Sequence, residues 1–157
     1  MSECSRPADL RWSIRASFFQ YVAGLHDGRA SVSDGASMTQ DDPQVVVFPA
    51  DLDHTTDSVL AFRGDLRMSG HGGLLFVRLA NPRIELGEPA TLTVDDPAIE
   101  DGSGPRLPLV TLTLTTDGSG WSGADVRLHQ AGVALFNHVY PAGADFDPLT
   151  IRGSLTP

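Results

Sequence analysis

Glycine and proline interrupt this chain at short intervals along its whole length, and this pattern limits the fold more than any other feature. The 157 residues include 16 Gly and 11 Pro, which are spread rather than clustered. Frequent turns between short apolar segments are typical of an all-β domain. The sequence therefore predicts two packed antiparallel sheets in a sandwich-like arrangement, with one short N-terminal helix against an edge or an end.

The N-terminal segment departs from this strand pattern. Apolar residues alternate from Leu10 to Ile14, as in a short strand, and then recur at intervals of three and four, which is the helical period. Ser13 is a candidate N-cap and Gly24 a candidate C-terminal stop, so a helix of about ten residues is expected between them. Three of its residues are predicted to share the inward face: Phe18, Tyr21 and Val22.

The clearest strand signal runs from Val59 to Gly70, where large apolar residues favour one parity and charged residues the other. This pattern predicts one long strand with a buried and a solvated face. Residues 70–73, Gly-His-Gly-Gly, interrupt it, and an apolar run from Leu74 to Leu79 follows, so the two segments are expected to form a hairpin. Further strands are predicted at Val45–Phe48, Arg83–Leu86, Ala90–Val94, Leu109–Thr115, Gly123–Leu128 and Leu149–Leu155. Turns are predicted at Ser33–Gly35, Asp101–Gly104 and Asp117–Gly120.

Composition and charge argue against several classes of function. The net charge is −9 and all 11 basic residues are Arg, which disfavours nucleic acids and anionic membranes as partners because both bind clustered basic surfaces. Cys4 is the single cysteine, so neither an intramolecular disulfide nor a zinc site built on paired cysteines can form. The sequence has no apolar run of membrane-spanning length and no secretory signal. We therefore expect a cytoplasmic protein with a flexible segment at residues 1–9 and one domain at residues 10–157.

Few side chains are available for chemistry. The chain has two tyrosines, Tyr21 and Tyr140, and its sequence contains no zinc-protease, phosphate-loop, dinucleotide or nucleophile-elbow motif. His71 stands between glycines, which let another group approach its backbone closely. Tyr21 is either a core tyrosine or a ligand whose phenolate is favoured by ferric iron and held by a histidine. Acidic pairs such as Asp95 and Asp96 lack the calcium-binding EF-hand pattern and are interpreted as turn and cap residues.

Three blocks of sequence, taken in order, resemble a known family. The first is residues 10–22, in which Trp12 is followed by Ser-Phe-x-x-Tyr. The second is residues 62–84, with Gly-His-x-Gly-x-Leu and an Asn-Pro turn, and the third is residues 136–149, with Tyr-x-x-Gly and Asp-Pro-Leu. Together they resemble the Htaa domain, the haem-binding module of actinobacterial haem-uptake proteins, over nearly the whole chain.

The resemblance implies a mostly-β domain that binds ferric haem b. Tyr21 stands at the position of the family's axial tyrosine ligand to the haem iron. His71 corresponds to the histidine that hydrogen-bonds this ligand, and Tyr140 to the family's closing tyrosine near the site. Two further residues are expected to line the porphyrin face: Phe18 and Phe19.

Three functions remain open at this point. Transport, storage or transfer of haem is favoured, with a haem donor or acceptor protein as partner and with Arg67 or Arg78 paired to the propionates. The second is a cytoplasmic haem enzyme of peroxide type, because the family is usually exported and this chain shows no signal. Its distal group would be one of four histidines: His26, His54, His129 or His138. The third is a cofactor-free sandwich that binds a small apolar ligand or a protein partner, with Trp12 and Trp121 as exposed platforms.

Overall fold

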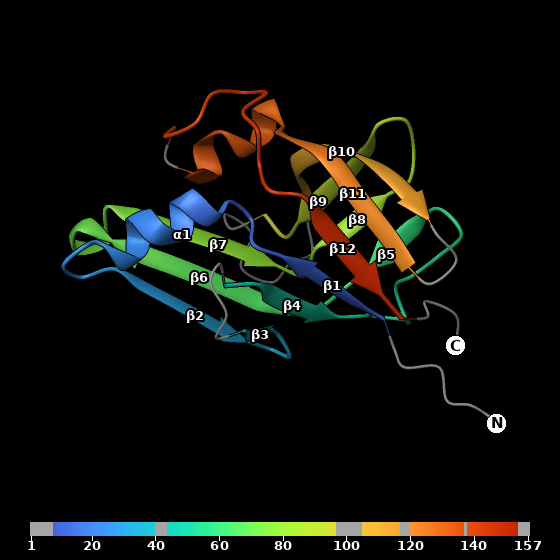
Figure 1. Ribbon diagram of the computed structural model, residues 1–157, viewed down its shortest axis with the longest axis horizontal. Helices are drawn as coiled ribbons and strands as arrows, with labels where there is room; N and C mark the ends of the chain where they lie inside the picture. The colour runs from blue at the N-terminus through green and yellow to red at the C-terminus, as the bar shows by residue number, and fades with distance from the viewer. Residues whose placement is uncertain (1–7, 40–43, 97–104, 117–119, 137, 154–157) are drawn as a thin grey trace.

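The computed structural model describes residues 8–39, 44–96, 105–116, 120–136 and 138–153, and they form two antiparallel sheets (Figure 1). The larger sheet runs, in spatial order, through β3 (Ser37–Met38), β4 (Val46–Pro49), β1 (Asp9–Trp12), β12 (Leu149–Arg152), β11 (Gly120–Leu128), β10 (Leu107–Thr116), β9 (Ala90–Val94), β8 (Arg83–Glu85) and β5 (Val59–Ala61). The smaller sheet contains β2 (Arg29–Ser33), β6 (Asp65–Gly70) and β7 (Leu75–Ala80). The predicted all-β, sandwich-like fold is confirmed.

One hydrophobic core joins the two sheets. Leu66 and Met68 of β6 are completely buried in the same cluster as Ile84 of β8 and Leu92 of β9. The described residues also form three short 3₁₀ helices: η1 (His71–Gly73), η2 (Gln130–Gly132) and η3 (Ala134–Phe136). Within the part of the chain that the structure describes, no helix has the length and apolar character needed to cross a membrane.

The prediction of one long strand at residues 59–70 is wrong, because the strand is interrupted at Gly64. Gly64 has φ = 137°, a conformation that favours glycine. A Cβ atom added there would lie 2.6 Å from Ala36 Cβ and 2.9 Å from Phe48 Cδ1. β5 pairs with β8 in the larger sheet before the break, whereas β6 pairs with β2 and β7 in the smaller sheet after it.

The predicted helix is present but shorter and differently capped. α1 (Ala16–Ala23) begins after Arg15, and the Ser13 hydroxyl donates to the Gln44 carbonyl at 2.9 Å instead of capping the helix. The Asp147 carboxylate accepts the Ala16 N–H at 2.9 Å, so a residue from the far end of the chain satisfies the first turn. α1 ends at Gly24 as predicted. It packs against β2 and β6 of the smaller sheet.

The N-terminal boundary and two strands also differ from the sequence prediction. Ala8 is buried and Asp9 begins β1, so the flexible segment expected at residues 1–9 does not include these two residues, while residues 1–7 lie outside the described chain. β2 and β3 are short, mostly solvent-facing strands that the sequence analysis missed. The turn at residues 33–35 is confirmed, but residues 101–104 and most of 117–120 lie outside the described chain.

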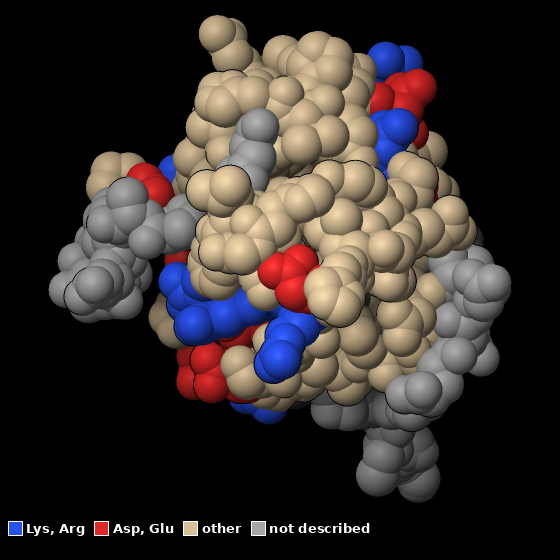
Figure 2. Space-filling model, turned by 90° about the vertical axis from the view of Figure 1, so that its left-hand side faces the viewer, with Lys and Arg blue, Asp and Glu red and all other residues tan. Residues whose placement is uncertain are grey.

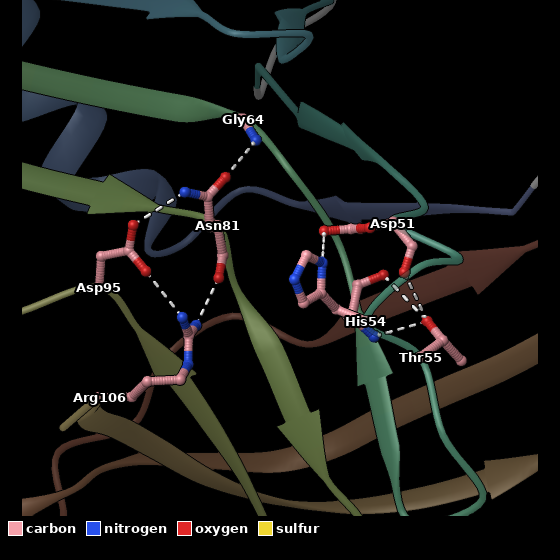
Figure 3. Close-up of polar contacts among 8 residues, drawn as sticks. Asp51, His54, Thr55, Gly64, Asn81, Asp95 and Arg106 are labelled. Carbon is pink, nitrogen blue, oxygen red and sulfur yellow. Dashed lines mark hydrogen bonds and ion pairs between the residues drawn. The ribbon is translucent and has the colours of Figure 1, made fainter. Parts of the chain in front are cut away.

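A polar network holds the base of the β6–β7 hairpin against the larger sheet (Figure 3). The Asn81 side chain accepts the Gly64 N–H at 3.2 Å and donates to Asp95 Oδ2 at 2.8 Å. The Arg106 guanidinium donates to Asp95 Oδ1 at 2.7 Å, to Thr93 Oγ1 at 2.9 Å and to the Asn81 carbonyl. Because these groups are largely buried and mutually satisfied, they stabilise one geometry at the hairpin base.

The Asp65 carboxylate, at the start of β6, pairs with two arginines of the smaller sheet. It is only 2% exposed, and it accepts hydrogen bonds from Arg67 Nε at 3.1 Å and Arg78 Nε at 3.0 Å. Burial acts to raise the pKa of the Asp65 carboxyl, but the hydrogen bonds and charges of the two arginines outweigh it and hold this pKa below its ordinary value.

We predict that Asp65 makes the fold sensitive to acid. A carboxyl whose pKa is lower in the folded than in the unfolded state stabilises the protein above about pH 4, and this stabilisation is lost as the pH falls through the folded-state pKa. The unfolding free energy of the wild type, measured by urea titration, should therefore fall more steeply below about pH 4 than that of Asp65→Asn. Parallel pH profiles for the two proteins would contradict this role.

Gly64→Ala should destabilise the protein by about 2–4 kcal/mol, because it combines a strained backbone with a steric clash. Gly143→Ala is the matched control, since Gly143 also has a positive φ of 84° but has open space around its Cβ position. The control should cost only about 1 kcal/mol, the penalty of the backbone conformation alone. Urea denaturation of both variants measures the difference, and equal losses would show that crowding at Gly64 does not matter.

Candidate functional site

Tyr21 and His71 meet at one end of the molecule, although they come from different elements. Tyr21 lies on α1 and His71 at the tip of the β6–β7 hairpin, and Tyr21 Oη lies 2.6 Å from His71 Nε2. The prediction that Tyr21 faces inward is wrong: its side chain is 47% exposed, whereas Phe18 one turn earlier is completely buried. The Phe18 ring lies behind the Tyr21 ring with 6.3 Å between centroids. The hydroxyl is thus accessible and already paired with an imidazole nitrogen.

The hairpin tip carries His71 in a left-handed backbone conformation. His71, Gly72 and Gly73 have φ values of 52°, 65° and 94°. A Cβ atom at either glycine would have no neighbour within 4 Å, so the backbone angle rather than crowding favours glycine here. Within the tip, the Leu74 N–H donates to the His71 carbonyl at 3.1 Å.

Asp27 is a residue of this site that the sequence analysis missed. Its carboxylate accepts the backbone N–H of Gly72 at 2.6 Å and that of His71 at 3.0 Å. The Gly72 hydrogen bond lowers the pKa of the Asp27 carboxyl, and the His71 hydrogen bond adds to this effect. No sequence signal marks Asp27, because its partners lie 44 and 45 residues away.

An aromatic cluster supports α1 from behind. Phe18, Phe136, Tyr140 and Phe146 contact one another edge to face, with centroid separations from 5.1 Å to 6.1 Å. The Arg15 guanidinium lies over the Tyr140 ring, 4.5 Å from its centroid. Tyr140 is therefore linked to Tyr21 through the Phe18 ring.

Two exposed apolar side chains lie close in sequence to residues of the site. Leu74, beside the tip, is 85% exposed, and Val139, next to Tyr140, is 51% exposed. The hairpin tip meets α1 through the Tyr21–His71 contact, and Phe136 and Tyr140 meet it through Phe18. Uncharged side chains make up most of this end of the molecule, and the charged ones gather in its lower half and at its upper right (Figure 2).

The other predicted site residues lie elsewhere or play structural parts. Phe19 is 8% exposed and belongs to the core. Arg67 and Arg78 are bound by Asp65. Trp12 cannot be an exposed platform, because it is 2% exposed and its indole N–H donates to the Asp147 carbonyl at 2.8 Å.

The remaining histidines do not hydrogen-bond Tyr21. His54 Nδ1 lies 2.7 Å from Asp51 Oδ2 (Figure 3), and His129 Nδ1 accepts the Ala131 N–H at 3.0 Å. His26 and His138 are exposed. Among the described residues, no group of three His, Cys, Asp or Glu side chains is arranged to hold a metal ion.

Comparisons with known proteins agree on one family. The family model Htaa matches residues 7–152. No curated protein sequence matches the chain. Among solved structures, the C-terminal domain of HtaA from Corynebacterium glutamicum is 27% identical, with a TM-score of 0.71 over 95% of this chain and 96% of that domain. The N-terminal domain of HtaA from the same organism is 22% identical, with a TM-score of 0.74 over 99% of this chain and all of that domain.

A further solved structure of the same fold is the heme binding protein HtaB from Corynebacterium glutamicum. It is 20% identical to this chain, with a TM-score of 0.74 over 96% of both chains. Because the family model covers nearly the whole chain, this protein belongs to the Htaa family.

Proposed function

We propose that this protein binds one ferric haem b through the Tyr21 phenolate, with His71 as the hydrogen-bond donor to that oxygen. The observation that carries the proposal is an exposed tyrosine hydroxyl 2.6 Å from an imidazole nitrogen. Membership of the Htaa family and the fold shared with a heme binding protein support it.

The Tyr21 oxygen has the chemistry that such a ligand requires. Ferric haem, when bound, would supply an iron that prefers a hard anionic oxygen as its protein ligand. Tyr21 presents such an oxygen at the surface, where a planar ligand reaches it without opening the core. The buried Phe18 ring fixes the Tyr21 ring from the protein side.

His71 controls the proton on the Tyr21 oxygen. In the 2.6 Å contact the proton sits either on Tyr21 Oη or on His71 Nε2. A phenolate oxygen accepts but cannot donate, so a hydrogen bond to it would require the proton to be on His71 Nε2. Such a charge-assisted hydrogen bond is about twice as strong as a neutral one.

Apolar contacts complete the proposed site. Leu74, which follows the hairpin tip, and Val139, which precedes Tyr140, are exposed apolar side chains that would be available to contact the porphyrin. Phe18, Phe19 and Tyr140 support the site through the packing of α1. Arg67 and Arg78 are not included as propionate partners, since Asp65 already pairs with both.

We further propose that the protein transports, stores or transfers haem with a donor or acceptor protein. Tyr21 is half-exposed, and the apolar side chains of Leu74 and Val139 also face solvent. A ligand held at such a surface can leave to a partner without unfolding of the core. A phenolate ligand also favours the ferric state, which suits the exchange of oxidised haem.

Haemin titration of Tyr21→Phe and Tyr140→Phe tests the ligand. Each variant removes one hydroxyl and keeps the ring, so the aromatic packing of α1 is preserved. Wild type and Tyr140→Phe should bind one equivalent with a tyrosinate-type ferric absorption spectrum. Tyr21→Phe should lose this spectrum and weaken binding by at least about 100-fold, the upper end of the effect of groups outside the coordination shell.

An unchanged spectrum and affinity in Tyr21→Phe would overturn the assignment of the ligand. Absence of saturable haemin binding by the wild type would overturn the proposed function itself.

A further inference from the structure

We propose that Asp27 is a positioning residue of the haem site, because its carboxylate holds the hairpin tip so that His71 Nε2 faces Tyr21 Oη. This inference rests on the proposed function, since the position of His71 matters only if Tyr21 binds the ligand. Asp27 itself does not contact Tyr21 and acts through the backbone of residues 71 and 72.

The tip needs an external partner to keep its conformation. His71 adopts φ = 52°, a backbone conformation that residues with a Cβ atom rarely take. The neighbouring glycines, Gly72 and Gly73, make no packing contacts at their Cβ positions, and His71 and Leu74 are exposed. The hydrogen bonds from the His71 and Gly72 N–H groups to the Asp27 carboxylate therefore hold the tip where side-chain packing does not.

Close backbone packing brings Asp27 to the tip. The chain folds back after α1, and a Cβ atom at Gly28 would lie 1.7 Å from the Val22 carbonyl oxygen. A Cβ atom at Gly70 would lie 2.5 Å from Leu25 Cδ1 and 3.8 Å from Gly28 Cα. The loop after α1 and the end of β6 thus approach within a distance that only small residues allow, and Asp27 points from this contact to the tip.

Tyr21, Asp27 and His71 therefore form a closed ring of contacts. Tyr21 and Asp27 lie on one continuous segment, α1 and the loop that follows it. His71 is bound at both ends by that segment, through its side chain by Tyr21 and through its backbone by Asp27. Loss of Asp27 leaves His71 attached to α1 by its side chain alone, so the tip can move away from Tyr21.

A double-mutant cycle tests whether Asp27 acts through His71. The variants are Asp27→Ala, His71→Ala and the double variant, each loaded with haemin, and the readout is the rate of haem loss to excess apomyoglobin. Asp27→Ala should accelerate haem loss about tenfold while the tyrosinate-type spectrum is retained. In the His71→Ala background the same change should accelerate haem loss by less than about twofold.

Asp53→Ala is the matched control, because Asp53 is an exposed aspartate in the turn between β4 and β5 and its removal changes the net charge equally. Its haem loss should equal that of the wild type. Equal acceleration by Asp27→Ala in both backgrounds, or none in either, would overturn the positioning role.

Hydrogen exchange in the haem-free protein provides a readout that does not depend on ligand binding. Asp27→Ala should speed exchange of the His71 and Gly72 amides, because both lose their hydrogen bonds to the carboxylate, whereas Asp53→Ala should leave their exchange unchanged. Unchanged exchange at both amides would overturn the proposal even if haem binds. Failure of the wild type to bind haemin would overturn the haem site. Faster exchange in Asp27→Ala would still establish that Asp27 holds the hairpin tip.

Discussion

The interruption of the strand at Gly64 is the constraint on which the rest of the structure depends. A positive φ and the absence of room for a Cβ between Ala36 and Phe48 turn the chain out of the larger sheet. β6 consequently pairs with β2 and β7 in a sheet of its own, and the tip of the β6–β7 hairpin extends to the same end of the molecule as α1 (Figure 1). A continuous strand would carry His71 along the larger sheet and away from Tyr21.

The hairpin is held very differently at its two ends. At its base, the Asn81–Asp95–Arg106 network and the Asp65 ion pairs are buried and share many hydrogen bonds. At its tip, exposed residues are fixed by hydrogen bonds to Asp27 and by the Tyr21–His71 contact. Local opening free energies follow buried contacts, so the tip is the part of the hairpin that opens most readily. The buried base therefore keeps the hairpin in place when its tip opens locally.

Periodicity predicted the helix, the hairpin and most strands, but it could not predict where local patterns yield to distant contacts. Alternation continues across Gly64 with the same parity on both sides, so the change of sheet leaves no mark in the pattern. Ser13 is a good N-cap by type, yet Asp147 caps the helix from 131 residues away. The helical period of Phe18, Tyr21 and Val22 indicates one apolar face of the helix, but it does not show how far the buried part of that face extends. Tyr21 lies at its exposed edge.

The sequence predicted the site residues whose type or setting is rare in this chain, but not the one whose type is common. Tyr21 is one of two tyrosines and His71 is flanked by glycines, so both stand out in the sequence, and the contact between them follows from the fold. Asp27 is one of many acidic residues in a chain of net charge −9, and nothing local distinguishes it. Its importance arises because the left-handed tip turns two backbone N–H groups toward one carboxylate. A positioning residue of this kind is visible only once the backbone that it holds has been determined.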